Sequence, residues 1–343
     1  MITRRNLLFS LPAIAAAPRA MAQPANPIIR LRSINHVTIR VSDFKRSLEF
    51  YQGLLGMVVQ GRQGATVALQ IGSGPQHIGM SAAAANEKVG INHFCMTVEG
   101  FNVDGILKIL ATRGVTPRGE SAGAVGPLKS YVRMRYEAEG GGKEGTPELY
   151  FTDRDGILLQ LQDASYCGGS GPLGNLCLTK PEPLPRKGLL AVRDLSHVTL
   201  NVSDQPRSLA FYQEMFRMPV QAHQGPMPIL GIGSARQFLA LSGGGANGAT
   251  ARTAGPAHLC MIMESFHVDK VLKALADFGV KPRGDARGPV GPLMSYVRMR
   301  GEEAGGAKDG TPELYFSDPD GILLQLQDAS YCGGSGYFGN VCG

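Results

Sequence analysis

The sequence Thr146-Pro-Glu-Leu-Tyr-Phe-Thr-Asp-Arg-Asp-Gly-Ile-Leu-Leu-Gln-Leu-Gln-Asp-Ala-Ser-Tyr-Cys-Gly168 returns nearly letter for letter at residues 311–333, so the protein is built from two copies of one unit. Within it, an apolar run ends at Asp153-Arg-Asp-Gly156, which has the chemistry of a tight turn, and a second apolar run leaves that turn. This pattern predicts a β-hairpin. Because strand side chains alternate, Gln160 and Gln162 share one face, which is predicted to point at something other than a hydrophobic core.

The composition is that of an ordinary globular chain. Of its 343 residues, 43% are hydrophobic and 18% are charged, and the length suffices for two domains with cores. The formal net charge is +6, and subtracting the three arginines of the leader described next (Arg4, Arg5 and Arg19) leaves +3. This balance gives little support to nucleic-acid binding.

Residues 1–22 are predicted to be an export signal. The pair Arg4-Arg5 begins a basic segment, residues 7–17 are apolar, and Ala20-Met21-Ala22 offers small residues for cleavage before Gln23. The segment resembles a twin-arginine signal, which implies a periplasmic or secreted protein that folds before the export machinery moves it. A membrane anchor is the disfavoured alternative, because a spanning helix needs about 20 apolar residues.

The first predicted domain opens with an amphipathic strand. In the stretch Ile34–Val41, apolar residues alternate with His36, Thr38 and Arg40, so these three polar side chains share one face. Ser42 or Asp43 then caps a helix predicted over Phe44–Leu55. Strands over residues 65–71 and 76–80 follow that helix.

The same order of strand, helix and strands occurs four times. The second copy opens at Ile91-Asn-His93 and continues with a helix from about Val103 to Arg113 and with strands over 130–135, 148–151 and 157–162. Two further copies open at Leu195-Ser-His197 and at Ala257-His258. Four βαβββ modules predict an α+β fold, in which paired modules form two domains with curved mixed sheets around a cavity. The predicted boundaries are 1–22 for the export signal, 31–168 for the first domain, 169–190 for a Cys/Pro-rich linker, 191–333 for the second domain and 334–343 for a tail.

The histidines indicate the chemistry. Four of the seven sit early in the first strand of a module, at His36, His93, His197 and His258, whereas His77 has no counterpart in the other copy. A single strand histidine is usually a satisfied core or surface residue, but four at one structural position favour ligands. Pairing the sheets would bring together two sets that each suit a divalent transition metal, namely His36, His93 and Gln160, and His197, His258 and Gln325.

A family resemblance rests on these residues. The paired modules, the opening His-Val-Thr, the helix sequence Ser-Leu-(Glu/Ala)-Phe-Tyr-Gln and the closing Tyr-Phe-(Thr/Ser)-Asp-(Arg/Pro)-Asp-Gly resemble the vicinal-oxygen-chelate superfamily. That group includes glyoxalase I, fosfomycin- and bleomycin-resistance proteins and extradiol ring-cleaving dioxygenases. The resemblance covers nearly all of the chain after about Arg30 and implies that the two sets above are its metal ligands. The extradiol signature is closest in spacing, from Leu314-Tyr315 through Asp318-Pro-Asp-Gly321 to Gln325.

Two departures from that pattern matter. The usual last ligand is Glu, and Gln160 and Gln325 remove one negative charge from each set, although Gln is a ligand in glyoxalase-type sites. Where the dioxygenases place a histidine that assists proton transfer, this chain has Lys143 and Lys308. A lysine could do acid–base work if desolvation lowered its pKa, whereas the glycine-rich surroundings favour exposed loops.

Other residues are candidates for the cavity lining. Tyr150 and Tyr315 match the signature tyrosine that would hydrogen-bond a substrate oxygen. Cys95 and Cys260, two positions after a ligand histidine, are extra ligands, redox-sensitive neighbours or simply small buried residues. In the strand over 130–135, Tyr131, Arg133 and Arg135 either face inward and favour an anionic substrate or lie solvated on the rim.

The remaining cysteines support export independently of the leader. Cys167 with Cys177, and Cys332 with Cys342, are joined by short glycine-rich segments that allow each pair to close in an oxidising compartment. The Cys-x-x-Cys spacing of zinc ribbons is absent from the sequence. We therefore predict two local disulfides.

Three functions remain open at this point. The first is an extradiol-type dioxygenase acting on a small catechol-like aromatic, with Fe²⁺ as the first choice of metal and Mn²⁺, Zn²⁺ or Ni²⁺ as alternatives. The second is a glyoxalase-type lyase or isomerase that uses the metal as a Lewis acid. The third is a non-catalytic protein that sequesters a ligand. All three functions predict a small aromatic or vicinal-oxygen compound as the ligand. The two enzymatic functions also predict one metal ion per domain. The sequence leaves open whether the protein forms a homo-oligomer.

Overall fold

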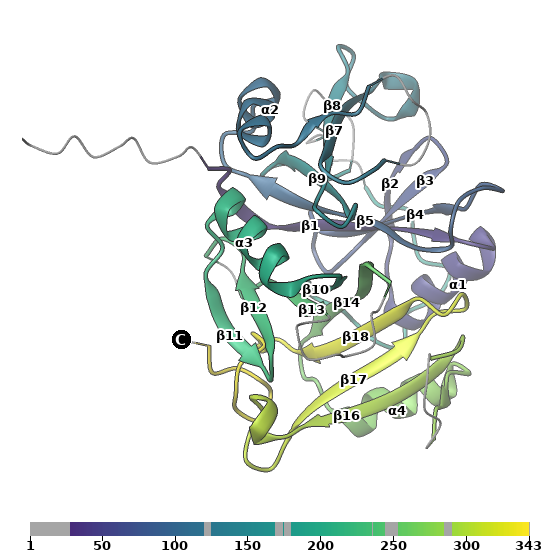
Figure 1. Cartoon of the computed structure of the whole chain (residues 1–343). Helices are drawn as coiled ribbons and strands as arrows, with labels where there is room; N and C mark the ends of the chain where they lie inside the picture. Colours follow the sequence, from purple (N-terminus) through teal and green to yellow (C-terminus); the bar gives the residue numbers. More distant parts are fainter. Residues whose placement is uncertain are drawn as a thin grey trace, which may run out of the picture.

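The structure is a computed structural model, and it describes residues 28–119, 125–168, 174, 180–234, 236–243, 253–284 and 290–342. The predicted export signal, residues 1–22, lies outside the described residues, and so does Cys177. Each copy of the repeat forms one nine-stranded mixed sheet, and the two sheets lie against each other in one molecule (Figure 1). No helix in the described ranges is long and apolar enough to cross a membrane.

The first sheet has the order β2-β3-β4-β1-β5-β9-β8-β7-β6. Its elements in chain order are β1 (Leu31–Val41), α1 (Phe44–Leu55), β2 (Val59–Gln63), β3 (Thr66–Gln70), β4 (His77–Ala82), β5 (Gly90–Val98), α2 (Val103–Thr112), β6 (Thr116–Pro117), β7 (Lys129–Arg135), β8 (Thr146–Thr152) and β9 (Leu158–Asp163). Strand β1 runs parallel to β4 and antiparallel to β5, so the two modules of the domain join along β1 and β5.

The second sheet repeats that order as β11-β12-β13-β10-β14-β18-β17-β16-β15. Its elements are β10 (Asp194–Val202), α3 (Gln205–Phe216), β11 (Val220–Gln224), β12 (Met227–Gly231), β13 (Phe238–Gly243), β14 (Gly255–Met263), α4 (Val268–Asp277), β15 (Lys281–Pro282), β16 (Met294–Arg300), β17 (Thr311–Ser317) and β18 (Leu323–Asp328). The predicted α+β fold of four βαβββ modules in two domains is confirmed, and each second module carries an added two-residue strand, β6 or β15.

Alternation along β1 separates core from cavity. Val37 and Ile39 are fully buried in the hydrophobic core, whereas His36, Thr38 and Arg40 line a polar cavity on the other face. Helix α1 begins where the side chain of Asp43 accepts a hydrogen bond from the Arg46 amide at 3.0 Å, as the sequence predicts. The sheet therefore presents its polar face to the site and its apolar face to the helices.

The two domains cap each other's helices. The turn between β17 and β18 reaches α1, where Asp320 accepts from the Ser42 amide at 2.9 Å and Asp318 accepts from the Tyr51 hydroxyl at 3.1 Å. The equivalent turn of the first domain reaches α3, where Asp153 accepts from the Tyr212 hydroxyl at 2.9 Å. Figure 1 shows α1 beside the β17–β18 hairpin. Each hairpin turn is thus shared between its own sheet and the opposite domain.

Strands β1 and β10 are joined by a reciprocal pair of amide side chains. Gln237 accepts from the Ile34 amide at 2.8 Å and donates to the Leu195 carbonyl at 2.7 Å, and Gln76 makes the mirror pair of contacts. Buried apolar residues of both domains belong to one continuous core. The two domains consequently form a single packed unit.

The shared turn aspartates give the fold a pH dependence. Burial raises the pKa of Asp153 and of Asp318 to about 6, although backbone amides donate to both carboxyls. Each carboxyl therefore holds its proton more tightly in the folded chain than in the unfolded chain, where aspartate titrates near about 4. Because the folded state binds more protons between about pH 4 and pH 6, stability falls as pH rises through that window and levels off above it.

We expect the Asp153→Asn variant to lose part of this dependence. Its amide oxygen can keep the hydrogen bonds that the Asp155 and Ile157 amides make to Oδ1, both 2.9 Å, but the group does not ionise. The difference in free energy of unfolding between pH 4 and pH 7 should change by about 1–3 kcal/mol. Urea unfolding at both pH values measures it. Asp309→Asn, which changes an exposed turn residue, is the control. If the free energy of unfolding depended on pH equally in the two variants, Asp153 would not be the source of the pH dependence.

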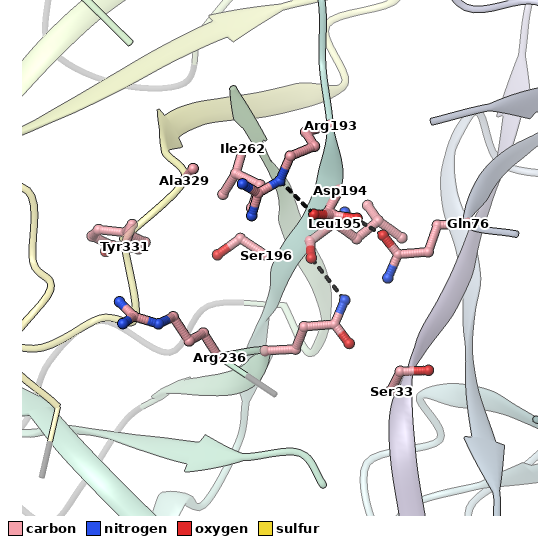
Figure 2. A pocket seen from close by; sticks show the side chains of 11 residues that line it. Ser33, Gln76, Arg193, Asp194, Leu195, Ser196, Arg236, Ile262, Ala329 and Tyr331 are labelled. Atoms are coloured by element: carbon pink, nitrogen blue, oxygen red, sulfur yellow. Dashed lines mark hydrogen bonds and ion pairs between the residues drawn. The ribbon is translucent and has the colours of Figure 1, made fainter. Parts of the chain in front are cut away.

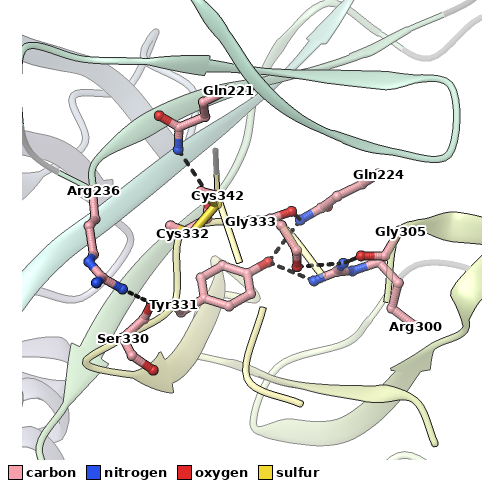
Figure 3. Close-up of a disulfide and its surroundings, with 11 residues drawn as sticks. Gln221, Gln224, Arg236, Arg300, Gly305, Ser330, Tyr331, Cys332, Gly333 and Cys342 are labelled. Carbon is pink, nitrogen blue, oxygen red and sulfur yellow. Dashed lines mark hydrogen bonds between the residues drawn. A yellow bond between two sulfur atoms is a disulfide. The ribbon is translucent and has the colours of Figure 1, made fainter. Parts of the chain in front are cut away.

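One of the predicted disulfides is confirmed. Cys332 and Cys342 are bonded, with their Cα atoms 6.1 Å apart (Figure 3). The Gln221 side chain donates to the Cys332 carbonyl at 2.9 Å, and Ser335 forms a bridge with Val341, so the C-terminal residues are held against the second sheet. The first pair, Cys167 with Cys177, stays a prediction.

Removing the second disulfide should destabilise the protein measurably. The bond closes a loop with a sequence separation of 10, and a loop of that size restricts the unfolded chain by about 2–3 kcal/mol. We expect the Cys332→Ser/Cys342→Ser variant to lose about that much free energy of unfolding. Urea denaturation without reductant measures the loss, and adding reductant to the unchanged protein should lower its stability by at least as much, because the predicted Cys167–Cys177 bond is reduced as well. An unchanged midpoint in both experiments would rule out a stabilising role.

Candidate metal centre

Three side chains predicted as ligands meet in the first domain. Gln160 Oε1 lies 3.1 Å from His36 Nε2 and 3.1 Å from His93 Nε2. The residues come from β9, β1 and β5, which are neighbouring strands at the centre of the sheet. All three side chains are buried, with at most 6% exposed. The structure therefore brings together the three side chains that the sequence pattern grouped as predicted ligands.

The residue before each histidine fixes the proton on its ring. Asn35 Oδ1 lies 2.8 Å from His36 Nδ1, and Asn92 Oδ1 lies 2.7 Å from His93 Nδ1. An amide oxygen only accepts hydrogen bonds, so with these oxygens facing the rings Nδ1 is the protonated nitrogen and Nε2 presents a lone pair. The orientation of Asn35 is fixed by its Nδ2, which donates to the Tyr166 carbonyl at 2.7 Å. Burial lowers the pKa of His36 well below its ordinary value and that of His93 to about 3. Both rings are consequently neutral and able to act as ligands at physiological pH.

The donor set fits a divalent cation. Two Nε2 lone pairs and one amide oxygen converge with no proton between them, which is repulsive unless a cation lies among them. Their 3.1 Å separations are close to the roughly 3.0 Å between adjacent ligands of an octahedral ion with bonds of about 2.1 Å. Rotating the Gln160 amide by 180° would let its NH₂ group donate to both imidazoles. The amide oxygen would then occupy the buried position that the amide nitrogen of Gln160 now holds, where no hydrogen-bond partner is present. Among the described residues, no three His, Cys, Asp or Glu side chains are grouped so as to hold a metal ion, and the third donor of this set is Gln160.

The second domain repeats this set with differences. Gln325 Oε1 lies 3.0 Å from His258 Nε2, and the rings of His197 and His258 have centroids 5.5 Å apart, against 5.7 Å in the first domain. Burial lowers the pKa of His258 to about 4 and that of His197 well below its ordinary value. The Nε2 of Gln325 is also buried without a hydrogen bond. All six predicted ligands are therefore gathered in two sets, and their ligation stays a prediction.

A narrow polar cavity of about 50 Å³ opens onto the first set. Its lining includes Arg40, Arg133, Arg135 and Glu148, so cationic side chains outnumber the carboxylate. This volume holds a few water molecules, and a larger ligand requires lining side chains to move. Arg133 is suited to such movement, because its side chain is 52% exposed.

A buried ion pair lies beside the donors. Arg135 Nε donates to Glu148 Oε1 at 2.9 Å, with the two side chains 1% and 4% exposed. The other oxygen of Glu148 accepts from the Tyr150 hydroxyl at 3.1 Å, and Arg135 also donates to the Tyr166 hydroxyl at 3.1 Å. The second domain has the same network, made of Arg300, Glu313, Tyr315 and Tyr331.

The two signature tyrosines lie at the sites. Tyr150 packs edge-on against His93, with ring centroids 5.3 Å apart, and Tyr315 does the same with His258 at 5.3 Å. Burial and the neighbouring Glu148 raise the pKa of Tyr150 well above its ordinary value, so its hydroxyl keeps its proton and can donate. A role in binding a substrate oxygen stays a prediction for both tyrosines.

The two lysines are placed differently. Lys143 and Lys308 are exposed on loops, and Lys143 is not part of the lining of the first-domain cavity. This placement agrees with the exposed-loop alternative, and the contacts lend no support to acid–base work by either lysine.

The neighbouring cysteines are buried thiols. Cys95 and Cys260 are free and 0% exposed, and burial raises both pKa values well above the ordinary range. Each Sγ contacts the carbonyl of the following methionine, at 3.8 Å and 3.6 Å. These contacts favour the reading as small buried residues.

The polar side chains of the strand over 130–135 differ in how far they reach into the cavity. Tyr131 stacks on Tyr150 with centroids 4.9 Å apart, and Arg133 and Arg135 both line the cavity. Arg135 is fully buried, whereas Arg133 sits at the rim. Arg135 therefore takes the inward orientation, whereas Arg133 takes the solvated rim position that was the other alternative.

Several residues of the site were not identified from the sequence. Glu148 is two positions before Tyr150, so alternation alone could have placed it on the same face. Asn35 and Asn92 precede the histidines directly, but their contact depends on the local backbone and carries no sequence signal. His77 stacks on His36 with centroids 4.5 Å apart because β4 pairs with β1 in register, and only the strand order reveals this.

Comparisons with known proteins agree with this architecture. The sequence matches the model of the Glyoxalase/Bleomycin resistance protein/Dioxygenase superfamily over residues 33–161 and 194–326. Homoprotocatechuate 2,3-dioxygenase from Arthrobacter globiformis is similar with a TM-score of 0.57 and 17% identity, over 89% of this chain and 82% of that chain. A Mn(II)-bound glyoxalase from Novosphingobium aromaticivorans has a TM-score of 0.57 and 17% identity, over 87% of this chain and 82% of that chain.

A third solved structure is homoprotocatechuate 2,3-dioxygenase from Brevibacterium fuscum in an anaerobic complex with 3,4-dihydroxyphenylacetate. Its TM-score is 0.58 at 16% identity, over 89% of this chain and 82% of that chain. Comparison with curated proteins gives no match. At these identities the solved structures show a shared fold. Because the family model covers more than half of the chain in two successive segments, the protein belongs to the Glyoxalase/Bleomycin resistance protein/Dioxygenase superfamily.

Proposed function

We propose that the protein is a divalent-metal-dependent enzyme that carries out an extradiol-type oxidation of a small, anionic, catechol-like aromatic. The observation that carries this proposal is the convergence of two lone-pair-bearing imidazoles on one amide oxygen, each 3.1 Å away. Three donors on one side leave other positions of the ion free for two adjacent substrate oxygens and for O₂. When bound, the ion supplies positive charge that lowers the cost of ionising the diol.

The residues around the donors are suited to orient such a substrate. Arg133 lines the cavity with a half-exposed side chain and favours a negatively charged substituent, while Arg40 is paired with Glu87 at 3.3 Å and Arg135 with Glu148 at 2.9 Å. The protonated Tyr150 hydroxyl, now bonded to Glu148, can turn to a substrate oxygen. The reaction consumes O₂, breaks one carbon–carbon bond beside a hydroxylated carbon, and leaves both oxygen atoms in the ring-opened product.

Glyoxalase-type isomerisation is the second candidate, and two observations favour it. The oxygen donor is a neutral amide, which lowers the negative charge that stabilises Fe²⁺ for O₂ chemistry. In addition, the cavity contains a buried carboxylate, Glu148, that could move a proton between adjacent carbons if Arg135 released it. Two solved structures of similar fold, a dioxygenase and a Mn(II)-bound glyoxalase, are compatible with either reaction.

The two reactions are separated by O₂ consumption. The purified protein is loaded anaerobically with Fe²⁺ and given a panel of catechols and hydroquinones, with and without a carboxylate, while O₂ uptake and ring-cleavage absorbance are recorded. Uptake that prefers the carboxylated catechols supports the proposal. If no compound consumes O₂ but a Ni²⁺- or Zn²⁺-loaded sample isomerises an α-hydroxy-carbonyl adduct, the second candidate replaces it. Ligand binding without turnover under either condition would make the protein a sequestering binder.

We also propose that the enzyme works outside the cytoplasm after cleavage before Gln23. The arginine pair and apolar run of residues 1–22 support this, and so does the Cys332–Cys342 disulfide, which an oxidising compartment maintains. N-terminal sequencing of the protein recovered from the periplasm or medium tests it. Replacing Arg4-Arg5 by two lysines should retain the protein in the cytoplasm, and normal export of that variant would argue against the twin-arginine route.

A further inference from the structure

The two donor sets differ in what lies behind the imidazoles. In the first domain, Asn35 and Asn92 each hold a ring Nδ1, at 2.8 Å and 2.7 Å. The residues at the same positions of the second domain are Ser196 and Ala257. Ser196 Oγ lies 3.1 Å from His197 Nδ1, and Ala257 has no polar side-chain atom to offer.

This difference affects which ring nitrogen carries the proton. The amide of Asn35 has a fixed orientation, because its Nδ2 donates to the Tyr166 carbonyl at 2.7 Å and its oxygen must therefore face His36. A serine hydroxyl both donates and accepts, so Ser196 does not select the protonated Nδ1 that a ligand imidazole needs. In the described part of the chain, Nδ1 of His258 has no hydrogen-bond partner at all. Hydrogen bonds of this kind typically change metal affinity by about 10–100-fold.

The lone pair of His258 is also engaged by another group. Thr199 Oγ1 lies 3.2 Å from His258 Nε2 and can donate its hydroxyl proton to that nitrogen. The equivalent Thr38 makes no hydrogen bond to His93 within the described ranges. A metal ion at the second set would therefore have to displace a hydrogen bond that the first set lacks.

A cavity separates the strand that carries His197 from the segment that follows β18. A space of about 300 Å³ is lined by Ser196, Tyr331 and Arg236, among others, and lies between β10 and the segment after β18 (Figure 2). In the first domain, Asn35 links the same two segments through the Tyr166 carbonyl. In the second domain the residue equivalent to Tyr166 is Tyr331, and Arg236 Nη1 donates to the carbonyl of the preceding residue, Ser330, at 2.6 Å. His197 thus lacks the direct strand-to-loop link that fixes its counterpart.

We infer that a tightly bound divalent ion occupies only the first-domain set, His36, His93 and Gln160, and that Asn35 and Asn92 are the positioning residues that select it. The second-domain set is then a hydrogen-bonded cluster within the core of its sheet. The positive charge of Arg40 near His93 disfavours a cation at the first-domain set. Glu87 lies 3.3 Å from Arg40 Nε and largely compensates that charge. The inference rests on the proposed metal-dependent function and narrows the predicted two ions per chain to one.

Metal stoichiometry tests the assignment without any measurement of activity. The metal-free full chain is titrated with Mn²⁺ and followed by calorimetry and by the electron paramagnetic resonance of free Mn²⁺. We expect one tight ion per chain. His93→Ala should abolish tight binding, whereas the matched variant His258→Ala should retain it with an affinity within about threefold of the unchanged protein.

Variants of the positioning residues test how the selection works. Asn92→Ala should weaken the tight site by about 10–100-fold, whereas Asn92→Asp, which keeps an acceptor facing Nδ1, should restore the affinity. The melting temperature of the metal-free variants shows whether a loss of affinity reflects a loss of fold. In the second domain, Ala257→Asn supplies the missing acceptor and should strengthen binding there.

The outcomes separate this inference from the function on which it rests. Two ions of equal affinity, or a tight ion lost in His258→Ala and kept in His93→Ala, would overturn the inference and leave the metal-dependent function standing. Equal affinities of Asn92→Ala and the unchanged protein would overturn the role of Asn92 alone. If Mn²⁺, Fe²⁺, Ni²⁺ and Zn²⁺ all fail to bind, both the inference and the proposed function are wrong.

Discussion

Replacing Arg135 by methionine is expected to lower the free energy of unfolding by about 3–5 kcal/mol, because it leaves Glu148 buried without its counter-charge. The two side chains are 1% and 4% exposed, and Nε of Arg135 is 2.9 Å from the carboxylate. Arg135 also donates to the Gly140 carbonyl at 2.6 Å and to the Tyr166 hydroxyl at 3.1 Å, so these acceptors lose a donor as well. Urea unfolding at neutral pH measures the loss.

The neighbouring Arg133 provides a matched control on the same strand. Its side chain is 52% exposed and its partner Glu139 is 47% exposed, so Arg133→Met should change stability by less than about 1 kcal/mol. A second variant, Arg135→Met/Glu148→Gln, removes the uncompensated charge and should recover part of the loss while keeping an acceptor for Tyr150. Equal losses from the variants at Arg133 and Arg135 would show that the buried pair does not have the role assigned to it.

The Gln160→Glu variant should bind divalent metal about 10–100-fold more tightly than the unchanged chain. The substitution keeps the size and position of the oxygen donor and restores the carboxylate of a two-histidine, one-carboxylate site. Glu148 cannot supply that charge, because Arg135 neutralises it at 2.9 Å. Calorimetric titration with Mn²⁺, and the rise in melting temperature on adding the metal, both report the change.

Gln325→Glu is the matched substitution in the second domain, where no asparagine accepts a hydrogen bond from the histidine rings. We expect the affinity of the first-domain site to stay unchanged in this variant. In the absence of metal, Gln160→Glu should be less stable than the unchanged protein, because the new carboxylate is buried without a cation. An unchanged or weaker metal affinity in Gln160→Glu would contradict ligation by residue 160.

The sequence pattern was sufficient to predict the strands whose two faces differ. In β1, Val37 and Ile39 lie in the core while His36 faces the cavity, and this alternation places the histidine correctly without any knowledge of the fold. Strand β2 (Val59–Gln63) was not predicted, because it is a sheet edge whose residues are mostly half-exposed and which includes Gly61. A strand of that kind has no strong period-two signal.

Contacts between the domains could not be predicted in the same way. Gln76 and Gln237 look like ordinary surface amides in the sequence, yet they join β1 to β10. The same limitation applies to Glu148, whose charge is tolerable in the interior only because Arg135, 13 residues earlier, pairs with it across β7 and β8. The predicted ligands followed from a local pattern, whereas the hydrogen-bond partners of those residues depend on which strands become neighbours.

The contacts by which each domain caps a helix of the other determine when those caps can form in a newly synthesised chain. Ser42 donates its amide to Asp320, which comes 278 residues later, so α1 cannot gain this cap until nearly the entire polypeptide has left the ribosome. Contacts between such distant residues form late, because a long loop must close first. The N-terminal end of α1 therefore gains this contact only when synthesis of the chain is nearly complete. The contact between Ser42 and Asp320 is thus a property of the finished chain and is absent from a chain that is still being translated.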